Sequence, residues 1–126
     1  MLYTYILQPP TLELLRSLQD KDYLNDFYLA GGTALALYYG HRQSIDIDLF
    51  TNTDFDTSVI LELMQQDYSL QLFLTLENTI KGTIEGINID IIAHKYPLLK
   101  EPVTDGKIRL LSEPDILAMK LNAISL

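Results

Sequence analysis

The pattern of hydrophobic and polar positions switches several times between the period of an amphipathic helix and that of a β-strand. A helical spacing predicts helices over residues 9–18, 33–39, 54 or 56 to 66, and 112–124. Short apolar or alternating segments predict strands over residues 26–30, 45–51, 70–76, 79–85, 87–94 and 107–111. Because helices and strands are interspersed along the chain, we expect an α/β (α+β) fold, with a mixed sheet flanked by helices.

Two of the predicted strands carry carboxylates among isoleucines. Asp46 and Asp48 lie two residues apart, so on a strand both side chains leave the same face, roughly 7 Å apart. Asp90 is the one charged residue in the run from Ile87 to Ala93. Carboxylates among apolar neighbours are poorly solvated unless a cation or a donor meets them, so these acids are candidate ligands for a hard divalent cation. The alternatives are a polar strand edge for the aspartate pair and a solvent-facing position for Asp90.

A pair of glycines, Gly31 and Gly32, stands between a predicted strand and the helix predicted from Thr33. Backbone N–H groups at the start of a helix can bind phosphate oxygens, helped by the helix dipole. A tight turn between strand and helix would need the same glycines. The segment is neither a Walker loop nor a dinucleotide-binding fingerprint, because the following residues and the glycine spacing do not match those motifs.

Two basic residues are candidates for binding phosphate. Lys120 stands on a predicted helix that is otherwise apolar except for Asn122. It is either a surface lysine that reaches solvent or a lysine aimed at an anion. Arg42 precedes the aspartate pair and can equally contact phosphate or lie in a solvated loop.

Length and composition limit the possible classes of protein. The 126 residues are enough for one domain, and 48% hydrophobic and 21% charged residues are ordinary for a globular protein. The absence of cysteine excludes disulfides and thiolate zinc sites. The net charge of −8 is opposite to that of a general nucleic-acid-binding protein, so an RNA substrate would need a local basic patch or parts supplied elsewhere. With no signal peptide or membrane-spanning stretch evident, we expect a cytoplasmic protein with no membrane partner.

Taken together, four segments of the chain resemble the AbiEii/AbiGii toxin family of nucleotidyltransferases, which belongs to the polymerase-β-like nucleotidyltransferase superfamily. The resemblance extends from about Phe27 to Ile124. It is carried by these segments: Leu29-Ala-Gly-Gly-Thr-Ala-Leu-Ala-Leu37, Gly40-His-Arg-Gln-Ser-Ile-Asp-Ile-Asp-Leu-Phe50, Ile87-Asn-Ile-Asp-Ile91 and Asp115-Ile-Leu-Ala-Met-Lys120.

The resemblance implies a role for each of these motifs. Asp46, Asp48 and Asp90 match the catalytic acids that hold Mg²⁺ or Mn²⁺. The nucleotide-binding residues implied are Gly31, Gly32, Thr33, Arg42, Ser44 and Lys120. The implied reaction moves a nucleoside monophosphate from a nucleoside triphosphate to a hydroxyl of an RNA, such as a tRNA, or of a protein. Such proteins often act as toxins paired with an antitoxin protein, in abortive infection or related defence.

One departure from the family leaves other functions open. Relatives usually continue past the lysine helix into a helical region with a further Lys-Asp motif, whereas this sequence stops at Leu126. We therefore expect a single nucleotidyltransferase-like domain over residues 1–126 that lacks this region. The alternatives are a catalytically inactive module that binds nucleotide or a partner, and a kinase-like phosphotransferase that moves the γ-phosphate.

Overall fold

A computed structural model describes residues 2–40 and 46–125 of the chain, with side chains up to residue 121. The described residues form a seven-stranded sheet and four α-helices, with two short 3₁₀ turns at Thr4–Ile6 and Asp22–Leu24. The strands are β1 (Tyr28–Ala30), β2 (Ile47–Thr51), β3 (Leu70–Leu76), β4 (Thr79–Ile84), β5 (Ile87–Ala93), β6 (Val103–Asp105) and β7 (Ile108–Leu110). The helices are α1 (Pro9–Gln19), α2 (Gly31–Tyr39), α3 (Thr57–Asp67) and α4 (Glu113–Ser125).

The sheet is mixed, as the sequence predicts. Its strand order is β3-β4-β5-β2-β1-β7-β6. Strands β2 and β5 run parallel, as do β1 and β7, and the remaining neighbours are antiparallel. The two strands that carry the candidate acids, β2 and β5, are therefore direct neighbours in the middle of the sheet.

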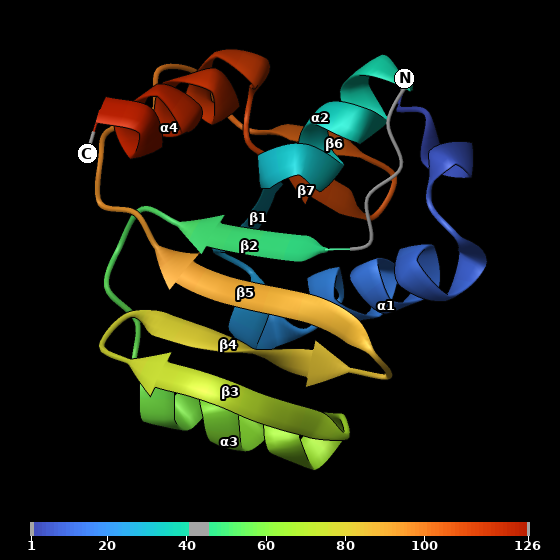
Figure 1. Cartoon of the computed structure of the whole chain (residues 1–126), viewed down its shortest axis with the longest axis vertical. Helices are drawn as coiled ribbons and strands as arrows, with labels where there is room; N and C mark the ends of the chain where they lie inside the picture. The colour runs from blue at the N-terminus through green and yellow to red at the C-terminus, as the bar shows by residue number, and fades with distance from the viewer. Residues whose placement is uncertain (1, 41–45, 126) are drawn as a thin grey trace.

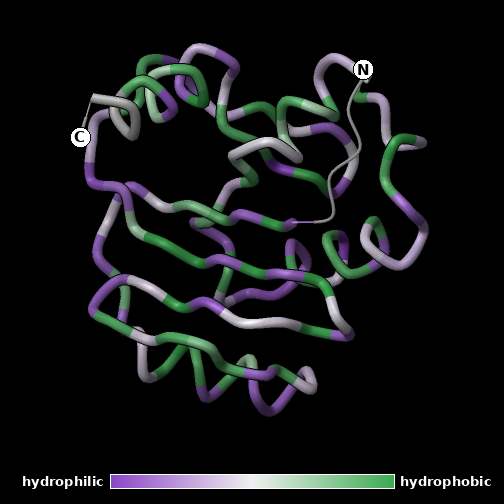
Figure 2. Tube along the Cα trace, in the orientation of Figure 1, coloured by the Kyte–Doolittle hydropathy of each residue, from purple (hydrophilic) through white to green (hydrophobic). Residues whose placement is uncertain are grey.

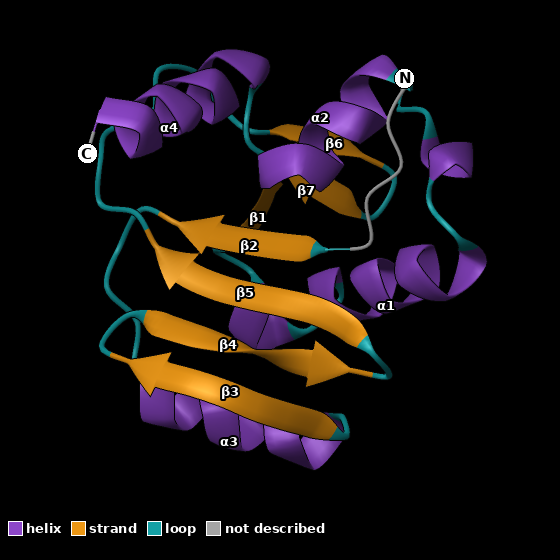
Figure 3. Cartoon of the chain, in the orientation of Figure 1, coloured by secondary structure: helices purple, strands orange, loops and turns teal. Residues whose placement is uncertain are grey.

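Helices cover the two faces of the sheet unequally. Helices α1 and α3 lie behind the sheet, whereas α2 and α4 lie in front of its β1–β7–β6 end (Figure 1). The front face of β5, β4 and β3 carries no helix (Figure 3). The open part of the front face therefore begins beside the middle strand β2.

Alternation along the central strands separates the core from this open face. On β5, Ile87, Ile89 and Ile91 are buried, whereas Asn88 is exposed and Asp90 is partly exposed. Figure 2 shows the same alternation of hydrophobic and hydrophilic residues along β5. Because successive side chains of a strand point to opposite faces, the isoleucines join the core and the polar residues face the open side.

The predicted elements are present, with three differences. The sequence does not predict the short edge strand β6, because Val103–Asp105 has no hydrophobic alternation, and in the structure all three residues are exposed. Strand β2 begins at Ile47, so Asp46 lies just before the strand rather than on it. Helix α2 begins at Gly31, so the glycine pair forms its first turn instead of preceding it.

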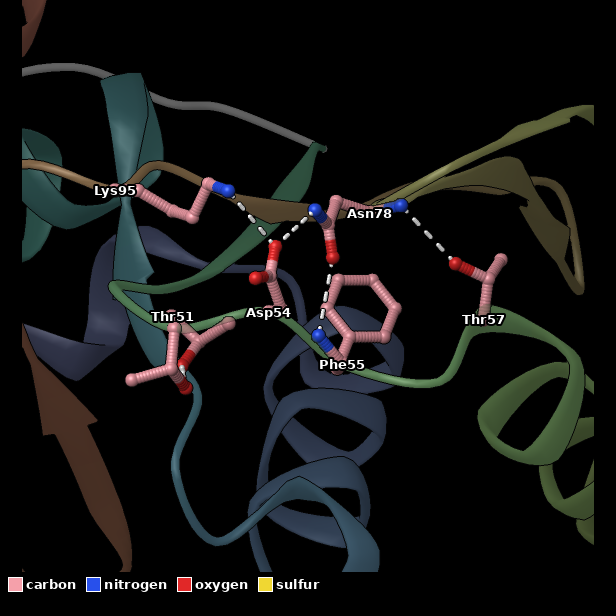
Figure 4. A network of polar contacts seen from close by, with 7 residues as sticks. Thr51, Asp54, Phe55, Thr57, Asn78 and Lys95 are labelled. Atoms are coloured by element: carbon pink, nitrogen blue, oxygen red, sulfur yellow. Dashed lines mark hydrogen bonds and ion pairs between the residues drawn. The ribbon is translucent and has the colours of Figure 1, made fainter.

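A polar network fixes the loop between β2 and α3 to the turn between β3 and β4 (Figure 4). The side chain of Asn78, a residue with φ of 58°, accepts a hydrogen bond from the Phe55 N–H and donates one to Asp54 Oδ1. The Asp54 carboxylate also pairs with Lys95 Nζ at 3.0 Å. Asparagine tolerates this left-handed backbone conformation better than most residues, and its side chain then supplies the loop with partners.

Among the helices that the structure describes, none is long and apolar enough to cross a membrane.

Candidate active site

The three candidate acids come together on the open face of the sheet. Asp48 and Asp90 occupy paired positions on the parallel strands β2 and β5, and Asp46 directly precedes β2. On β4, Lys81 pairs in register with Asp90. The sequence prediction that Asp90 lies on a strand beside the aspartate pair therefore matches the fold.

These side chains line one hollow of about 220 Å³. Its lining residues are Asp46, Asp48, Phe73, Leu74, Lys81, Gly82, Asn88 and Asp90. Five of them, on β3, β4 and β5, were not among the sequence candidates. Asn88 could have been found, because it stands two residues before Asp90 and so shares its face of the strand. The others follow from the pairing of β3, β4 and β5, which spacing in the sequence does not encode.

Electrostatic repulsion is concentrated at Asp48. Burial, together with the negative charges of Asp90 and Asp46, raises the pKa of Asp48 to about 6, and the nearby Lys81 opposes this rise. The pKa of Asp90 is also raised by burial, an effect that Lys81 counters and Asp46 adds to. Two neighbouring carboxylates that both resist ionisation form a site that gains from a bound cation.

Two polar side chains partly compensate for this repulsion. Lys81 Nζ lies 3.9 Å from Asp90 Oδ2, which is a long and partly exposed ion pair. Asn88 Nδ2 donates a hydrogen bond to Asp46 Oδ1 at 3.1 Å. Asp90 and Asp46 therefore each have a polar partner, on β4 and on β5 respectively.

The set of donors fits a hard divalent metal. Three carboxylates offer only oxygen ligands, which Mg²⁺ and Mn²⁺ prefer, and a dication would neutralise the charge that raises the pKa of Asp48. Within the described residues, no three Asp, Glu or His side chains are already grouped closely enough to hold an ion.

Gly31 brings the start of α2 against this site. Its φ is +71°, and a Cβ at this position would collide with Asp48 Oδ2. The side chain of Ala30, the residue before the helix, provides no cap, so the helix begins without a side-chain acceptor there. Thr33, in the first turn, donates its hydroxyl to the backbone carbonyl of Asp46. The start of α2 can therefore lie against the Asp48 carboxylate only because position 31 is a glycine, since a side chain there would displace the carboxylate.

Gly31→Ala is expected to destabilise the fold by about 2–4 kcal/mol, because the new methyl group would add a clash with Asp48 to the roughly 1–2 kcal/mol cost of a left-handed non-glycine residue. Gly86→Ala is the matched control. Gly86 has φ of +79° but open space around its Cβ position, so this change carries the backbone cost alone. Urea unfolding of both variants measures the difference, and equal losses of stability would contradict the close contact at Gly31.

The other sequence candidates are less closely connected to the hollow. Lys120 is exposed on α4, and no hydrogen bond or ion pair joins its side chain to another described residue. Helix α4 packs beside α2, which places the lysine helix next to the glycine helix. Arg42 and Ser44 lie outside the described residues.

The chain is similar in sequence to one curated protein of unassigned function. It is 37% identical over 105 residues to the uncharacterized protein aq_aa25 of Aquifex aeolicus strain VF5, a match that covers 80% of this chain and 51% of the relative. The chain thus spans about half the length of the curated relative it matches.

Solved structures share the fold at low sequence identity. The "putative nucleotidyltransferase (TM1012)" of Thermotoga maritima superposes with a TM-score of 0.62 and 21% identity, over 94% of this chain and 89% of that one. The CCA-adding enzyme of the same organism, solved in complex with tRNA, superposes with a TM-score of 0.56 and 21% identity, over 72% of this chain and 22% of the enzyme. JHP933 from Helicobacter pylori gives a TM-score of 0.57 and 17% identity, over 91% and 57% of the two chains.

A family model identifies the sequence more specifically than these folds do. The model described as "Nucleotidyl transferase AbiEii toxin, Type IV TA system" matches residues 13–97, which is more than half of the chain. The matched range includes the glycine helix start and all three acids of the hollow. The chain belongs to the AbiEii family of nucleotidyltransferase toxins.

Proposed function

We propose that this chain provides the catalytic acids of a metal-dependent nucleotidyltransferase. The observation that supports this most strongly is the convergence of Asp46, Asp48 and Asp90 in one hollow, directly against the start of α2 at Gly31. Acids and a helix start are the two groups that a metal-bound triphosphate needs. Neither the acids nor the helix start alone would specify the reaction. Because Gly31, at the start of α2, lies against Asp48, the acids and the helix start form one site.

The triphosphate of the donor nucleotide is expected on the α2 side of Asp48. The backbone N–H groups of Gly31, Gly32 and Thr33 form the first turn of α2, where the helix dipole favours an anion. Lys120, on the neighbouring helix α4, would add a flexible positive charge. Arg42 and Ser44 remain proposed contributors to the same nucleotide site.

Asp46, Asp48 and Asp90 would hold Mg²⁺ or Mn²⁺, which supplies charge neutralisation of the triphosphate and of the leaving pyrophosphate. The acceptor hydroxyl forms a bond to the α-phosphorus, and the bond from that phosphorus to the pyrophosphate oxygen breaks. Asp90 lies on the opposite side of Asp48 from the glycines and is the group that orients the hydroxyl and takes its proton. The amides of α2 stabilise the negative charge that develops on the phosphates.

Membership of the family supports a biological role as the toxin of a toxin–antitoxin or abortive-infection pair. An antitoxin protein would then be its regulatory partner. The likeness to an enzyme solved with tRNA favours an RNA acceptor over a protein acceptor.

The reaction is tested with nucleoside triphosphates labelled at either the α- or the γ-phosphate, incubated with the protein, Mg²⁺ and total cellular RNA and protein. Nucleotidyl transfer attaches the α-label to an acceptor and releases the γ-label in pyrophosphate. Attachment of the γ-label would instead show a kinase-like reaction. Attachment of neither label, with nucleotide still bound, would show an inactive binding module.

Lys120→Ala is expected to weaken binding of a nucleoside triphosphate by about 1.5–3 kcal/mol, the scale of a hydrogen bond to a charged group. The fold should persist, because the side chain is exposed and lacks partners among the described residues. Calorimetric titration with a non-hydrolysable analogue measures the loss. Lys107→Ala, which removes an exposed lysine from the β6–β7 turn, is the control. Unchanged affinity in the Lys120 variant would make that residue an ordinary surface lysine.

A further inference from the structure

The edge strand β3 presents an aromatic side chain at the acidic hollow. All residues of β3 after Leu70 are exposed, and Phe73 is 70% exposed. The pairing of β3 with β4 shifts between Leu72 and Leu74, so Phe73 has no register partner on β4. An irregularity of this kind re-aims side chains at a sheet edge, and here Phe73 and Leu74 both line the hollow of the acids.

A glycine on the neighbouring strand permits this arrangement. A Cβ at Gly82 would strike the backbone carbonyl of Gln71 and approach Leu70 Cδ1 to 3.0 Å. Gly82 also lines the hollow, together with Phe73 and the three acids. The close approach of β3 to β4 at this point therefore depends on the absence of a side chain at Gly82. This approach accompanies the position of the exposed Phe73 ring at the hollow.

The order of the strands shows on which side of the three acids Phe73 lies. Reading across the sheet, Gly31 contacts Asp48 from the β1 side, and Asp90, Lys81 and β3 follow on the other side. If phosphates of the donor lie at the start of α2, the β4–β3 side is where the acceptor must enter. Phe73 then stands where the terminal nucleotide of an acceptor strand would lie.

We propose that Phe73, with Leu74 beside it, is a stacking surface for an unpaired nucleobase at the end of an acceptor RNA strand. This rests on the proposed nucleotidyl transfer and specifies its acceptor. Single-stranded RNA is commonly bound by stacking bases on exposed aromatic rings. Lys81, which also lines the hollow, would meet the phosphate of the same nucleotide.

The charges in the hollow favour a nucleotide over an apolar protein surface. A protein partner or a second copy of the chain that covered Phe73 and Leu74 would also bury Lys81 and Asp90, whose ion pair is long at 3.9 Å. Burying an imperfectly paired charge is costly. A nucleotide combines a flat face for the ring with an anionic phosphate for the lysine, so it meets both requirements.

The chain contains no tryptophan, so Phe73→Trp creates a single fluorescent reporter at the proposed surface. Short single-stranded oligoadenylate is expected to quench its fluorescence, because a stacked base contacts the indole directly. Leu76→Trp is the matched control, since Leu76 is 59% exposed on the same strand but is absent from the hollow. Quenching confined to the Phe73 variant supports the proposal, and equal quenching in both variants overturns it.

Two further comparisons identify the source of the base. Oligoadenylate should quench more strongly than free AMP or duplex RNA, whereas equal quenching by AMP would overturn the assignment to an acceptor strand. A change of fluorescence with protein concentration alone would show self-association through β3 and would also overturn it.

Phe73→Ala should weaken oligoadenylate binding about 5- to 10-fold, the lower part of the range for stacking on one aromatic ring, and Phe73→Tyr should restore it. Affinity for a triphosphate analogue should stay at the wild-type value, because the donor lies on the α2 side. If oligoadenylate does not bind the wild-type chain while α-label is still transferred to another acceptor, this inference fails and nucleotidyl transfer stands.

Discussion

Asp48→Asn is expected to lower nucleotidyl transfer by at least about 10³-fold and, at neutral pH, to stabilise the fold. Asp48 is one of the three acids that line the hollow, and its amide replacement cannot supply the negative charge that a divalent metal requires. In the metal-free protein the ionised Asp48 carboxylate destabilises the fold, because burial and two neighbouring acids raise its pKa to about 6. Asp48→Asn should therefore lower activity while raising the stability of the metal-free fold.

The pH dependence of this stabilisation follows from the direction of the pKa shift. A carboxyl with a pKa raised on folding costs no stability below its unfolded value near 4, and the cost grows until the pH passes about 6. The expected gain of Asp48→Asn is about 1–2 kcal/mol above pH 6, after allowance for solvent screening of a partly exposed group, and close to zero near pH 4.

Urea unfolding with a metal chelator, at about pH 4 and about pH 7.5, measures this difference. Asp26→Asn is the control, because Asp26 is an exposed aspartate remote in sequence from the three acids. Mg²⁺ should reduce the difference in stability between Asp48→Asn and the wild type, because it should stabilise the wild type alone. A variant that is no more stable than wild type at pH 7.5, or that retains transfer activity, would contradict the role assigned to Asp48.

Asp115→Ala is expected to destabilise the fold by about 3 kcal/mol, because it removes a buried acceptor of several hydrogen bonds. Asp115 is 4% exposed and accepts hydrogen bonds from the backbone N–H groups of Leu99 and Lys100, at 2.7 and 3.1 Å. The Ser112 hydroxyl donates a third bond at 2.7 Å. Truncation leaves these donors unpaired and frees the loop after β5 from the start of α4.

Burial by itself would raise the pKa of Asp115, but the bonds from Leu99, Ser112 and Lys100 outweigh it and lower the pKa below its usual value. The stabilisation is therefore fully present above the unfolded value near 4 and is lost as the pH falls through the lower folded value. Thermal unfolding at about pH 7 should show a drop in melting temperature of roughly 10 °C. Asp115→Asn, which keeps one acceptor, should lose less. A loss below about 1 kcal/mol in the alanine variant would contradict this account.

The spacing of hydrophobic and polar residues is sufficient to predict most of the helices and strands. The predicted bounds of strand β3 match the observed ones, and Asp56, one of the two predicted starts of the helix, accepts a hydrogen bond from the Val59 N–H at the start of α3. The segment Ser112-Glu-Pro-Asp115 has the spacing of a capping box with Asp in place of Glu, but only half of this motif forms. Ser112 Oγ accepts the Asp115 N–H, but the Asp115 carboxylate turns to the loop at Leu99 and Lys100. A local pattern could not show that competing donors arrive from another segment.

The same limit applied to the site. Motifs identified Asp46, Asp48 and Asp90 because each is a polar residue out of place in an apolar strand, a signal carried by the sequence itself. Lys81 and Phe73 carry no such signal, since an exposed lysine and a strand phenylalanine are ordinary. Their importance depends on the pairing of β3 and β4 with β5, a tertiary property.

The strand order has a consequence for the way this chain folds. Strands β3, β4 and β5 are consecutive hairpins, so their contacts close short loops and can form early. In contrast, Leu29 of β1 pairs with Leu110 of β7, a separation of about 80 residues that costs more entropy to close. During synthesis, the edge of β1 that pairs with β7 therefore stays unpaired until nearly the whole described chain has been made. We expect folding to be polarised, with the meander that carries Lys81 and Asp90 forming first and the glycine helix gaining its final position last.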